Sequence, residues 1–245
     1  MRHGWAWIVG ACLLVYANSF QNGFHYDDEH SVQNNIHIRD LSNIGRFFSD
    51  PATFSVDHDK GMYRPLLLVS YALNYAVGGY EVSGYHLVNI ALHAANASLL
   101  WALLIAMGAG RSAALMAGLL FALHPLGSEP VNYISSRSES LAALFYLGGL
   151  WAFVLAQHRE SRVYRTLSWG CLLCGLLSKS SAITLPAVLL LYEIIVLRGA
   201  TSWRLGRDVL RRHGPYWIVS LGYIALIVAN RFLTTSLSKR VRGMD

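Results

Sequence analysis

Stretches of apolar residues, separated by polar segments, dominate the pattern of the chain. A helix of about 20 apolar residues is long enough to cross a bilayer. We expect spanning helices at about 4–20, 85–107, 112–124, 140–157, 166–178, 182–198 and 214–231. Short spans are tolerable where a helix is buried among others or dips only partway into the bilayer. The pattern therefore predicts an all-α, polytopic membrane helical bundle of about seven spans.

A further apolar segment, residues 64–77, is interpreted differently. It reads "RPLLLVSYALNYAV", is short for a span and ends at Gly78-Gly79. Pro65 suits the first turn of a helix, and the two glycines suit its end. We expect a helix that lies along the membrane interface or dips into it. It would belong to a first extracytoplasmic loop over residues 21–84.

Composition supports a membrane protein and excludes several soluble classes. Of the residues, 54% are hydrophobic and only 14% are charged, against roughly 25% charged in soluble domains. The chain has no Gly-rich phosphate loop, no serine nucleophile elbow and no basic domain free of apolar stretches. We therefore expect neither a nucleic-acid partner nor a soluble dehydrogenase or hydrolase. All three cysteines lie in apolar stretches, which argues against a disulfide framework or a zinc site.

The charged residues between the spans predict an orientation. Arginines gather in alternate connections, which should face the cytoplasm by the positive-inside rule: Arg111, Arg159, Arg162, Arg165, Arg198, Arg204, Arg207, Arg211 and Arg212. The opposite connections hold most of the carboxylates and should be extracytoplasmic. The basic tail ending in "RVRGMD" violates the rule, so we expect a truncated chain in which residues 1–245 form a single membrane module.

Chemistry is expected on the extracytoplasmic side. The loop "FHYDDEH" follows the first span, and an extended backbone there would point Asp27 and Asp28 in opposite directions. One carboxylate could act as a general base while the other positions it, or the pair could hold a divalent cation. The alternative is a solvated loop in which an Asp caps a helix.

A polar stripe runs along the second expected span, in "GYHLVNIALHAANAS". His86, Asn89, His93 and Asn96 fall within an arc of roughly 80° on a helix, so the stripe must face protein or water rather than lipid. Hydrogen bonds between helices account for His93 and Asn96 at least as well as substrate contact does. His86, at the outer end, is the better candidate for a site.

Two further places carry ionisable groups at helix ends on the same side. "HPLGSEPVNYISSRSES" contains His124, Glu129 and Arg137, and Arg offers a fork of donors suited to phosphate oxygens. An Arg–Glu pair that stabilises a turn is the structural alternative. Lys179 lies at a hairpin tip, where a lysine can also extend towards headgroups. Together these groups suit transfer from a lipid-linked phosphate donor to an extracytoplasmic acceptor.

Five segments, in this order, carry a resemblance to a known family: "NSFQNGFHYDDEHSVQNN", "YRPL", "GYHLVNIALHA", "FALHPLGSEPVNYISSRSESLAALF" and "LLSKSSAITLPAVLLLYE". They resemble the transmembrane and tetratricopeptide-repeat-containing (TMTC-like) protein O-mannosyltransferases and their bacterial relatives, within the GT-C glycosyltransferase superfamily. The resemblance covers residues from about 15 to about 198. It implies inverting transfer of a mannose-like sugar from a polyprenyl- or dolichyl-phosphate carrier to an acceptor hydroxyl of a protein, with lipid or glycan acceptors as the alternative.

The resemblance also implies roles for single residues. The acidic pair of the family falls on Asp27 and Asp28, one of them the catalytic base. Its donor- and substrate-binding positions fall on Arg64, His86, His124, Glu129, Arg137 and Lys179. The chain departs from the family at Ser180, where an acidic residue is usual. No metal ligand set is implied, and no cofactor is expected beyond a divalent cation, which is left open.

Two other classes of function are alternatives. A transporter would place charged groups near the bilayer midplane in two related halves, whereas here they lie towards one face and no repeat is visible. A non-catalytic membrane scaffold would tolerate loss of the acidic pair. An enzyme of the family would lie in the inner membrane of a bacterium, or in the endoplasmic reticulum membrane of a eukaryote, among membrane lipids and with its site extracytoplasmic.

Overall fold

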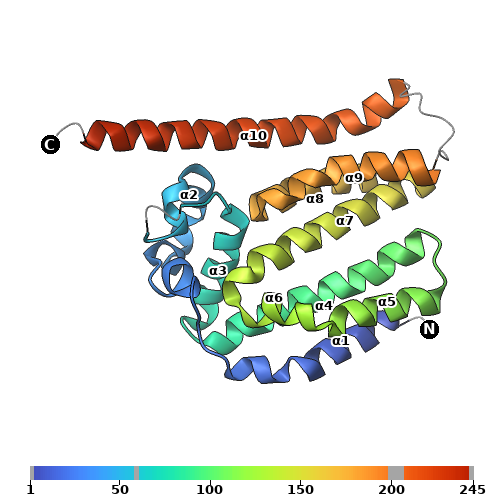
Figure 1. The fold of residues 1–245 in the computed structure, drawn as a ribbon, viewed down its shortest axis with the longest axis horizontal. Coiled ribbons are helices and arrows are strands. Elements are labelled where there is room, and N and C mark those ends of the chain that lie inside the picture. Colours follow the sequence, from blue (N-terminus) through green and yellow to red (C-terminus); the bar gives the residue numbers. More distant parts are fainter. Residues whose placement is uncertain (1–2, 58–60, 198–206, 243–245) are drawn as a thin grey trace. The chain divides into compact units, whose positions relative to one another are not determined.

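Every regular element in the described part of the chain is a helix (Figure 1). The computed structural model describes residues 3–57, 61–197 and 207–242. The all-α prediction is therefore confirmed. The chain divides into two compact units, the second of which begins at Pro186. The prediction of one module over the whole chain stays a prediction.

Long apolar helices build the body of the first unit. They are α1 (Gly4–Val15), α4 (Val82–Ala106), α5 (Arg111–Leu123), α7 (Arg137–Arg159) and α8 (Arg162–Ser178). The central helix is α4, which contacts α1, α5 and α7, while α7 packs along α8. In Figure 1 the α4–α5 and α7–α8 turns lie at one end of this unit, opposite α2 and α3.

A chain of short helical segments forms the first loop. Its members are η1 (Ala17–Gln21), η2 (Glu29–Gln33), η3 (Ile36–Arg39), η4 (Leu41–Asn43), α2 (Ile44–Ser49) and η5 (Pro51–Phe54). The side chains of Asn35, Asp40 and Asp50 cap three of them by accepting backbone N–H groups. Such caps satisfy the unpaired amides that every short helix leaves at its start.

The helix expected over residues 64–77 is present as α3 (Pro65–Gly78), and its place at the membrane interface stays a prediction. Pro65 occupies its first turn, and Gly79 ends it with φ of 58°, a left-handed conformation that favours glycine. Tyr71 and its neighbours pack on the short helices of the first loop, in a buried cluster that includes Val32, Phe47 and Phe54. The sequence therefore predicted both ends of α3.

The chain bends sharply after α5. His124 is extended, and α5 makes an angle of 55° with the following helical segment, residues 125–132. That segment consists of η7 (Pro125–Gly127) and α6 (Ser128–Asn132), and η8 (Ile134–Ser136) leads into α7. Proline at the start of η7 explains the break, because the residue before a proline avoids the helical region.

The end of the first unit and the described part of the second unit are also helical. η9 (Ser180–Thr184) leads from α8 into α9 (Leu185–Tyr192), which is followed by η10 (Glu193–Leu197) and α10 (Arg207–Arg242). Within the second unit, the buried carboxylate of Glu193 lies 3.2 Å from Arg212 Nη2 and 2.9 Å from His213 Nε2.

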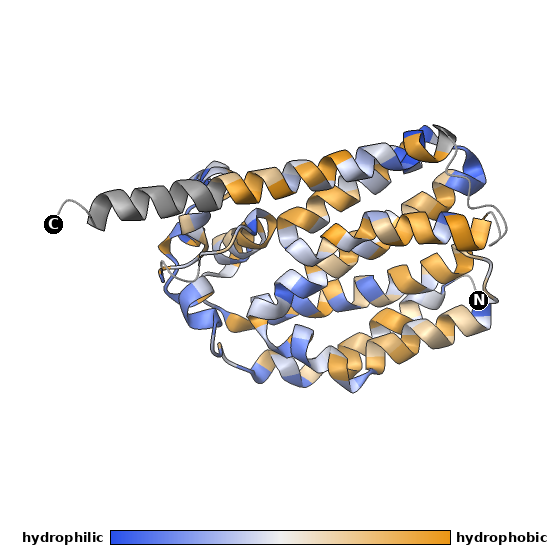
Figure 2. Cartoon of the chain, turned by 45° about the horizontal axis from the view of Figure 1, so that its top comes forward, coloured by the Kyte–Doolittle hydropathy of each residue, from blue (hydrophilic) through white to orange (hydrophobic). Residues whose placement is uncertain are grey.

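Membrane character follows from the apolar helices (Figure 2). Among the described residues, three helical segments are long and apolar enough to cross a bilayer, namely Val82–Ala106, Ile134–Arg159 and Ser180–Leu197. The bent pair of residues 111–132 would make a fourth if it counts as one span. A polytopic helical bundle fits these findings, and the number of seven spans stays a prediction.

Candidate functional site

The acidic loop turns sharply at the residue before Asp27. Tyr26 has φ of 48°, the left-handed region, which costs a non-glycine residue roughly 1–2 kcal/mol. Asp28 is in the right-handed helical region and immediately precedes η2. The expectation of an extended backbone is therefore wrong, because a tight turn occupies these positions. The two carboxylates nevertheless diverge, as expected.

Asp28 is completely buried and anchors the loop to the segment before α7. Its Oδ1 accepts hydrogen bonds from the backbone N–H of Ser135 at 2.7 Å and from the Ser135 hydroxyl at 2.6 Å. Its Oδ2 accepts the backbone N–H of His25 at 3.0 Å. A buried carboxylate needs such partners to offset its lost hydration. Asp28 thus joins two loops that are distant in sequence.

Asp27 lies beside this anchor and faces solvent. Its side chain is 60% exposed, and its Oδ1 lies 3.3 Å from Nε2 of His30. Its backbone N–H donates to the hydroxyl of Tyr133 at 3.1 Å. Burial raises the pKa of the Tyr133 phenol, which therefore keeps its proton at neutral pH. Asp27 is the member of the pair that an incoming molecule can reach.

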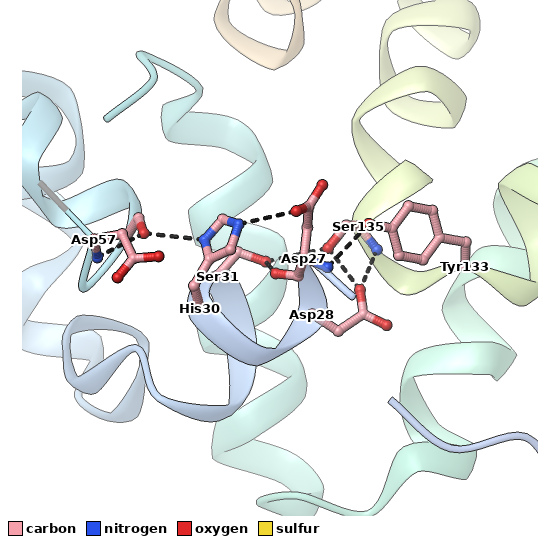
Figure 3. Close-up of polar contacts among 8 residues, drawn as sticks. Asp27, Asp28, His30, Ser31, Asp57, Tyr133 and Ser135 are labelled. Carbon is pink, nitrogen blue, oxygen red and sulfur yellow. Dashed lines mark hydrogen bonds and ion pairs between the residues drawn. The ribbon is translucent and has the colours of Figure 1, made fainter. Parts of the chain in front are cut away.

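His30 connects Asp27 to a second loop segment (Figure 3). Its Nδ1 lies 3.0 Å from the hydroxyl of Ser55, and Ser55 accepts the backbone N–H of Asp57 at 2.9 Å. The carbonyl of His30 also accepts the backbone N–H of Val56, with a nitrogen–oxygen distance of 3.5 Å. The sequence prediction did not include His30 or Ser55. The spacing of three residues between Asp27 and His30 could have indicated the pair, had a helical turn been considered.

A small polar pocket adjoins His30. Its volume is about 180 Å³, and its lining residues are Tyr26, Glu29, His30, Asn34, Val56 and Asp57. Glu29, which follows the pair, is exposed and lines this pocket. No group of three or more His, Cys, Asp or Glu side chains that could hold a metal ion occurs among the described residues.

Arg137 is fully buried at the start of α7. It donates hydrogen bonds to oxygen atoms of Ser70, Asn74, Tyr85 and Asn89. The rings of Tyr71 and Tyr85 lie 5.0 and 5.5 Å from its guanidinium carbon. These partners are neutral and come from α3 and α4. Arg137 therefore fastens three helices together beneath the loop, and its predicted contact with a phosphate stays a prediction.

The polar stripe of α4 faces protein, as expected. Each of its four members lies within hydrogen-bond distance of a backbone carbonyl: His86 of Val131, Asn89 of Val131 and Tyr133, His93 of Ala122, and Asn96 of Ser140. These contacts hold the end of α5, the segment between α5 and α7, and the start of α7 against α4. His86 is completely buried, so a substrate role for it stays a prediction.

Two of the predicted cations reach consecutive residues at the start of α7. Arg64 donates to the hydroxyl of Ser138 at 3.1 Å, and Lys179 forms an ion pair with Glu139. Arg64 comes from the residue before α3, and Lys179 from the turn after α8. Helix N-termini attract anions. This end of α7 therefore combines two cations with a helix N-terminus.

An apolar pocket opens beside Glu139. It has a volume of about 390 Å³ and is lined by Phe121, Glu139, Ala142, Ala143, Tyr146, Leu147, Ser181, Ala182 and Thr184. Its walls come from α5, α7 and η9. A pocket of this size and character suits part of a lipid chain.

The remaining predicted residues lie at the bend after α5. His124 and Glu129 are exposed. His124 Nδ1 accepts the backbone N–H of Leu126 at 3.2 Å and so caps η7. The hydrogen bonds of Arg137 go elsewhere than to Glu129.

Comparison with known proteins finds similar protein O-mannosyl-transferases. The chain is 33% identical to Protein O-mannosyl-transferase TMTC2 of Mus musculus over 196 residues, which are 75% of this chain and 23% of that protein. It is 34% identical to Protein O-mannosyl-transferase tmtc2 of Xenopus laevis over 224 residues, 86% of this chain and 26% of that protein. With Protein O-mannosyl-transferase Tmtc3 of Drosophila melanogaster it shares 29% identity over 238 residues, 83% and 25% respectively.

The chain spans about a quarter of the length of these curated relatives. No protein-family model matches the chain. No solved structure matches it either.

Proposed function

The chain belongs to the TMTC-like family of protein O-mannosyl-transferases, and from this premise we propose that it forms the catalytic face of a membrane glycosyltransferase. The donor is a mannose-like sugar on a polyprenyl or dolichyl phosphate. The acceptor is a serine or threonine hydroxyl of a protein on the extracytoplasmic side. The reaction inverts the configuration of the sugar.

The different exposure of the two neighbouring carboxylates carries this proposal. A general base must come within hydrogen-bond reach of the proton that it removes. Asp27 is exposed beside a polar pocket, whereas Asp28 is buried with its oxygens bonded to Ser135 and His25. We therefore assign the base to Asp27 and a positioning role to Asp28.

In the proposed step, Asp27 removes the proton of the acceptor hydroxyl as its oxygen attacks the anomeric carbon. The bond between that carbon and the phosphate oxygen breaks, and its electron pair leaves with the lipid phosphate. Attack and departure occur on opposite faces of the sugar, which gives inversion. The proton ends on Asp27 and later passes to water.

The donor is proposed to bind at the start of α7. A phosphate leaving group needs little protonation, so nearby cations stabilise it as charge develops. Arg64 and Lys179, which contact Ser138 and Glu139, supply such cations. The apolar pocket that begins at Glu139 would receive the adjoining part of the lipid chain.

The other residues that the sequence predicted to bind substrate have supporting roles in this proposal. His124 and Glu129 are exposed at the bend after α5, where a headgroup can reach them. His86 and Arg137 are buried beneath the loop and act by holding its base. The seven spans, the extracytoplasmic orientation and the location in a bacterial inner membrane or an endoplasmic reticulum membrane complete the proposal.

The test compares the two neighbouring carboxylates. Membranes containing the protein, or its Asp27→Asn or Asp28→Asn variant, receive a radiolabelled polyprenyl-phosphate mannose and protein acceptors. We expect Asp27→Asn to lower transfer by about 10²- to 10⁴-fold, because general-base catalysis contributes that much. The amount of folded protein is measured in parallel by its thermal unfolding in detergent.

Asp28→Asn is the matched control. An amide in place of one carboxylate oxygen weakens the bonds to Ser135, so we expect a lower unfolding temperature together with a loss of activity. Glu160→Gln, on an exposed carboxylate at the other end of the first unit, should change neither quantity. Equal transfer by the wild type and Asp27→Asn would refute the assignment of the base. Repeating the assay with a chelator tests the divalent cation.

A further inference from the structure

His30 lies between a buried hydroxyl and the exposed carboxylate of Asp27. The side chain of His30 is 10% exposed, with Nδ1 3.0 Å from the Ser55 hydroxyl and Nε2 3.3 Å from Asp27 Oδ1. In Figure 3 the imidazole of His30 lies between Asp27 and the loop segment that carries Asp57. Neither the sequence prediction nor the proposed reaction gives His30 a role.

The hydrogen-bond partners of His30 indicate which of its two ring nitrogens carries a proton. A carboxylate that acts as a base is ionised and can only accept hydrogen bonds. The nitrogen that faces Asp27 must therefore carry a hydrogen, which places a proton on Nε2. Ser55 accepts the N–H of Asp57 with one lone pair and keeps its own proton, which it can donate to Nδ1 of a neutral imidazole.

We propose that His30 is a positioning residue of the glycosyl-transfer site, which presents its Nε2–H to Asp27 Oδ1 and so holds this carboxylate in the orientation that receives the acceptor hydroxyl. Ser55 is the second part of this device, because its proton holds the imidazole in the required tautomer. This inference rests on the proposed function of Asp27. It adds the means by which an exposed carboxylate keeps one orientation.

The burial of the His30 side chain favours a positioning role over the role of general base. A side chain that is 10% exposed presents little surface to an acceptor, whereas the carboxylate beside it is accessible. The fold around His30 also has other supports, since the Val56 amide bonds to the His30 carbonyl and Ser31 bonds to the Asp27 carbonyl. The imidazole is therefore poised to orient Asp27 more than to hold the loop.

A matched pair of variants tests the donor. Glutamine can place its amide N–H near the position of Nε2, whereas methionine has a similar length and no donor. We expect His30→Met to lower kcat by about 10- to 100-fold with KM changed less than twofold, because misplacing a reacting group costs that much. His30→Gln should recover most of kcat. His37→Met, on a half-buried histidine of the same loop, should leave both constants unchanged.

Two results would overturn the inference in this assay. One is equal loss of kcat in His30→Gln and His30→Met. The other is full activity in His30→Met. Unfolding temperatures of all variants are compared with the wild type, so that activity is referred to the folded protein.

A second measurement is independent of catalysis. ¹⁵N nuclear magnetic resonance of histidine-labelled protein in lipid bilayers reports which ring nitrogen of His30 is protonated. We expect protonated Nε2 and unprotonated Nδ1 at a pH where the imidazole is neutral, and a mixture of tautomers in Ser55→Ala. Protonated Nδ1 in the wild type would refute the inference, even if no transferase activity were found. Absence of transfer by the wild type would refute only the proposed function.

Discussion

At the residue scale, burial gives different tasks to groups of the same charge. Asp27 and Asp28 are adjacent, yet one faces solvent and the other accepts three hydrogen bonds in the interior. Among the cations, Arg64 lies partly open at the start of α7, whereas Arg137 is fully enclosed. Residue type alone therefore does not indicate which of these groups meets the substrate.

Arg137→Lys tests the enclosed cation. An ammonium has three donors on one atom and cannot reach the oxygens that a planar guanidinium reaches on α3 and α4. We expect a loss of about 3 kcal/mol or more in unfolding free energy, because buried polar partners are left unpaired. Chemical unfolding in detergent measures it. Arg39→Lys, an exposed control, should change stability by less than about 0.5 kcal/mol.

An unchanged unfolding free energy in Arg137→Lys would contradict the fastening role. If the variant also kept its stability but lost affinity for the lipid donor, Arg137 would instead be a direct donor ligand, as the sequence resemblance implies.

At the residue scale the sequence predicted the divergence of the acidic pair but not its cause. Asp28 meets Ser135, and Arg137 meets Asn74 and Asn89, across separations of 48 to 107 residues. The pattern of polar and apolar residues in one segment does not predict which distant segment its side chains will contact. The left-handed backbone conformation of Tyr26 was not predicted from the sequence either, because the neighbouring residues contain no turn signal such as glycine or proline next to it.

At the element scale, helices approach closely where glycines face a neighbour. A Cβ at Gly149 of α7 would lie 2.7 Å from Leu185 Cδ2 and 3.4 Å from Cys171 Cβ of α8. At the adjacent Gly148 the nearest atom would be Cys171 Sγ at 3.4 Å. The contact between α7 and Leu185, the first residue of α9, thus depends on the absence of a side chain at Gly149, whereas Gly148 has room for one.

Gly149→Ala and Gly148→Ala form a matched test of this packing. Alanine favours a helix over glycine by about 0.5–1 kcal/mol, so Gly148→Ala should be neutral or slightly stabilising. Gly149→Ala must displace the fully buried Leu185, and we expect a net loss of about 1–2 kcal/mol. Unfolding temperatures in detergent compare the two. Equal stability of both variants would mean that Leu185 moves aside at no cost.

At the element scale, the ends of the helices were the part of the fold that the sequence predicted best. Pro65 and Gly79 bound α3, and the stripe on α4 correctly predicted a face turned towards protein. The bend after α5 follows from His124-Pro125. The short helices of the first loop were not predicted one by one, because each is too brief to show a period of its own.

At the scale of the whole molecule, the first unit separates its charges along its length. The turns between α4 and α5 and between α7 and α8 carry arginines and lie at one end, opposite the acidic loop (Figure 1). A bilayer between these ends would satisfy the positive-inside rule. The orientation assigned from the sequence is therefore compatible with the arrangement of the helices.

Cysteine labelling tests that orientation. In spheroplasts expressing a variant with Cys12, Cys171 and Cys174 replaced by alanine, we expect Ala52→Cys to react with a membrane-impermeant thiol reagent. Ser112→Cys should react only after the membrane is permeabilised. Both positions are exposed in the structure. Labelling of Ser112→Cys alone in intact spheroplasts would reverse the orientation and place the acidic loop in the cytoplasm.

The bond between Asp28 and Ser135 also bears on the order of synthesis. Its two residues are 107 positions apart, and a ribosome adding 5–20 residues per second needs roughly 5 to 20 s to make that interval. During this time the loop has emerged but lacks its anchor. The carboxylate beside it can take its final position only when the start of α7 has been inserted, so competence for reaction arises late in translation.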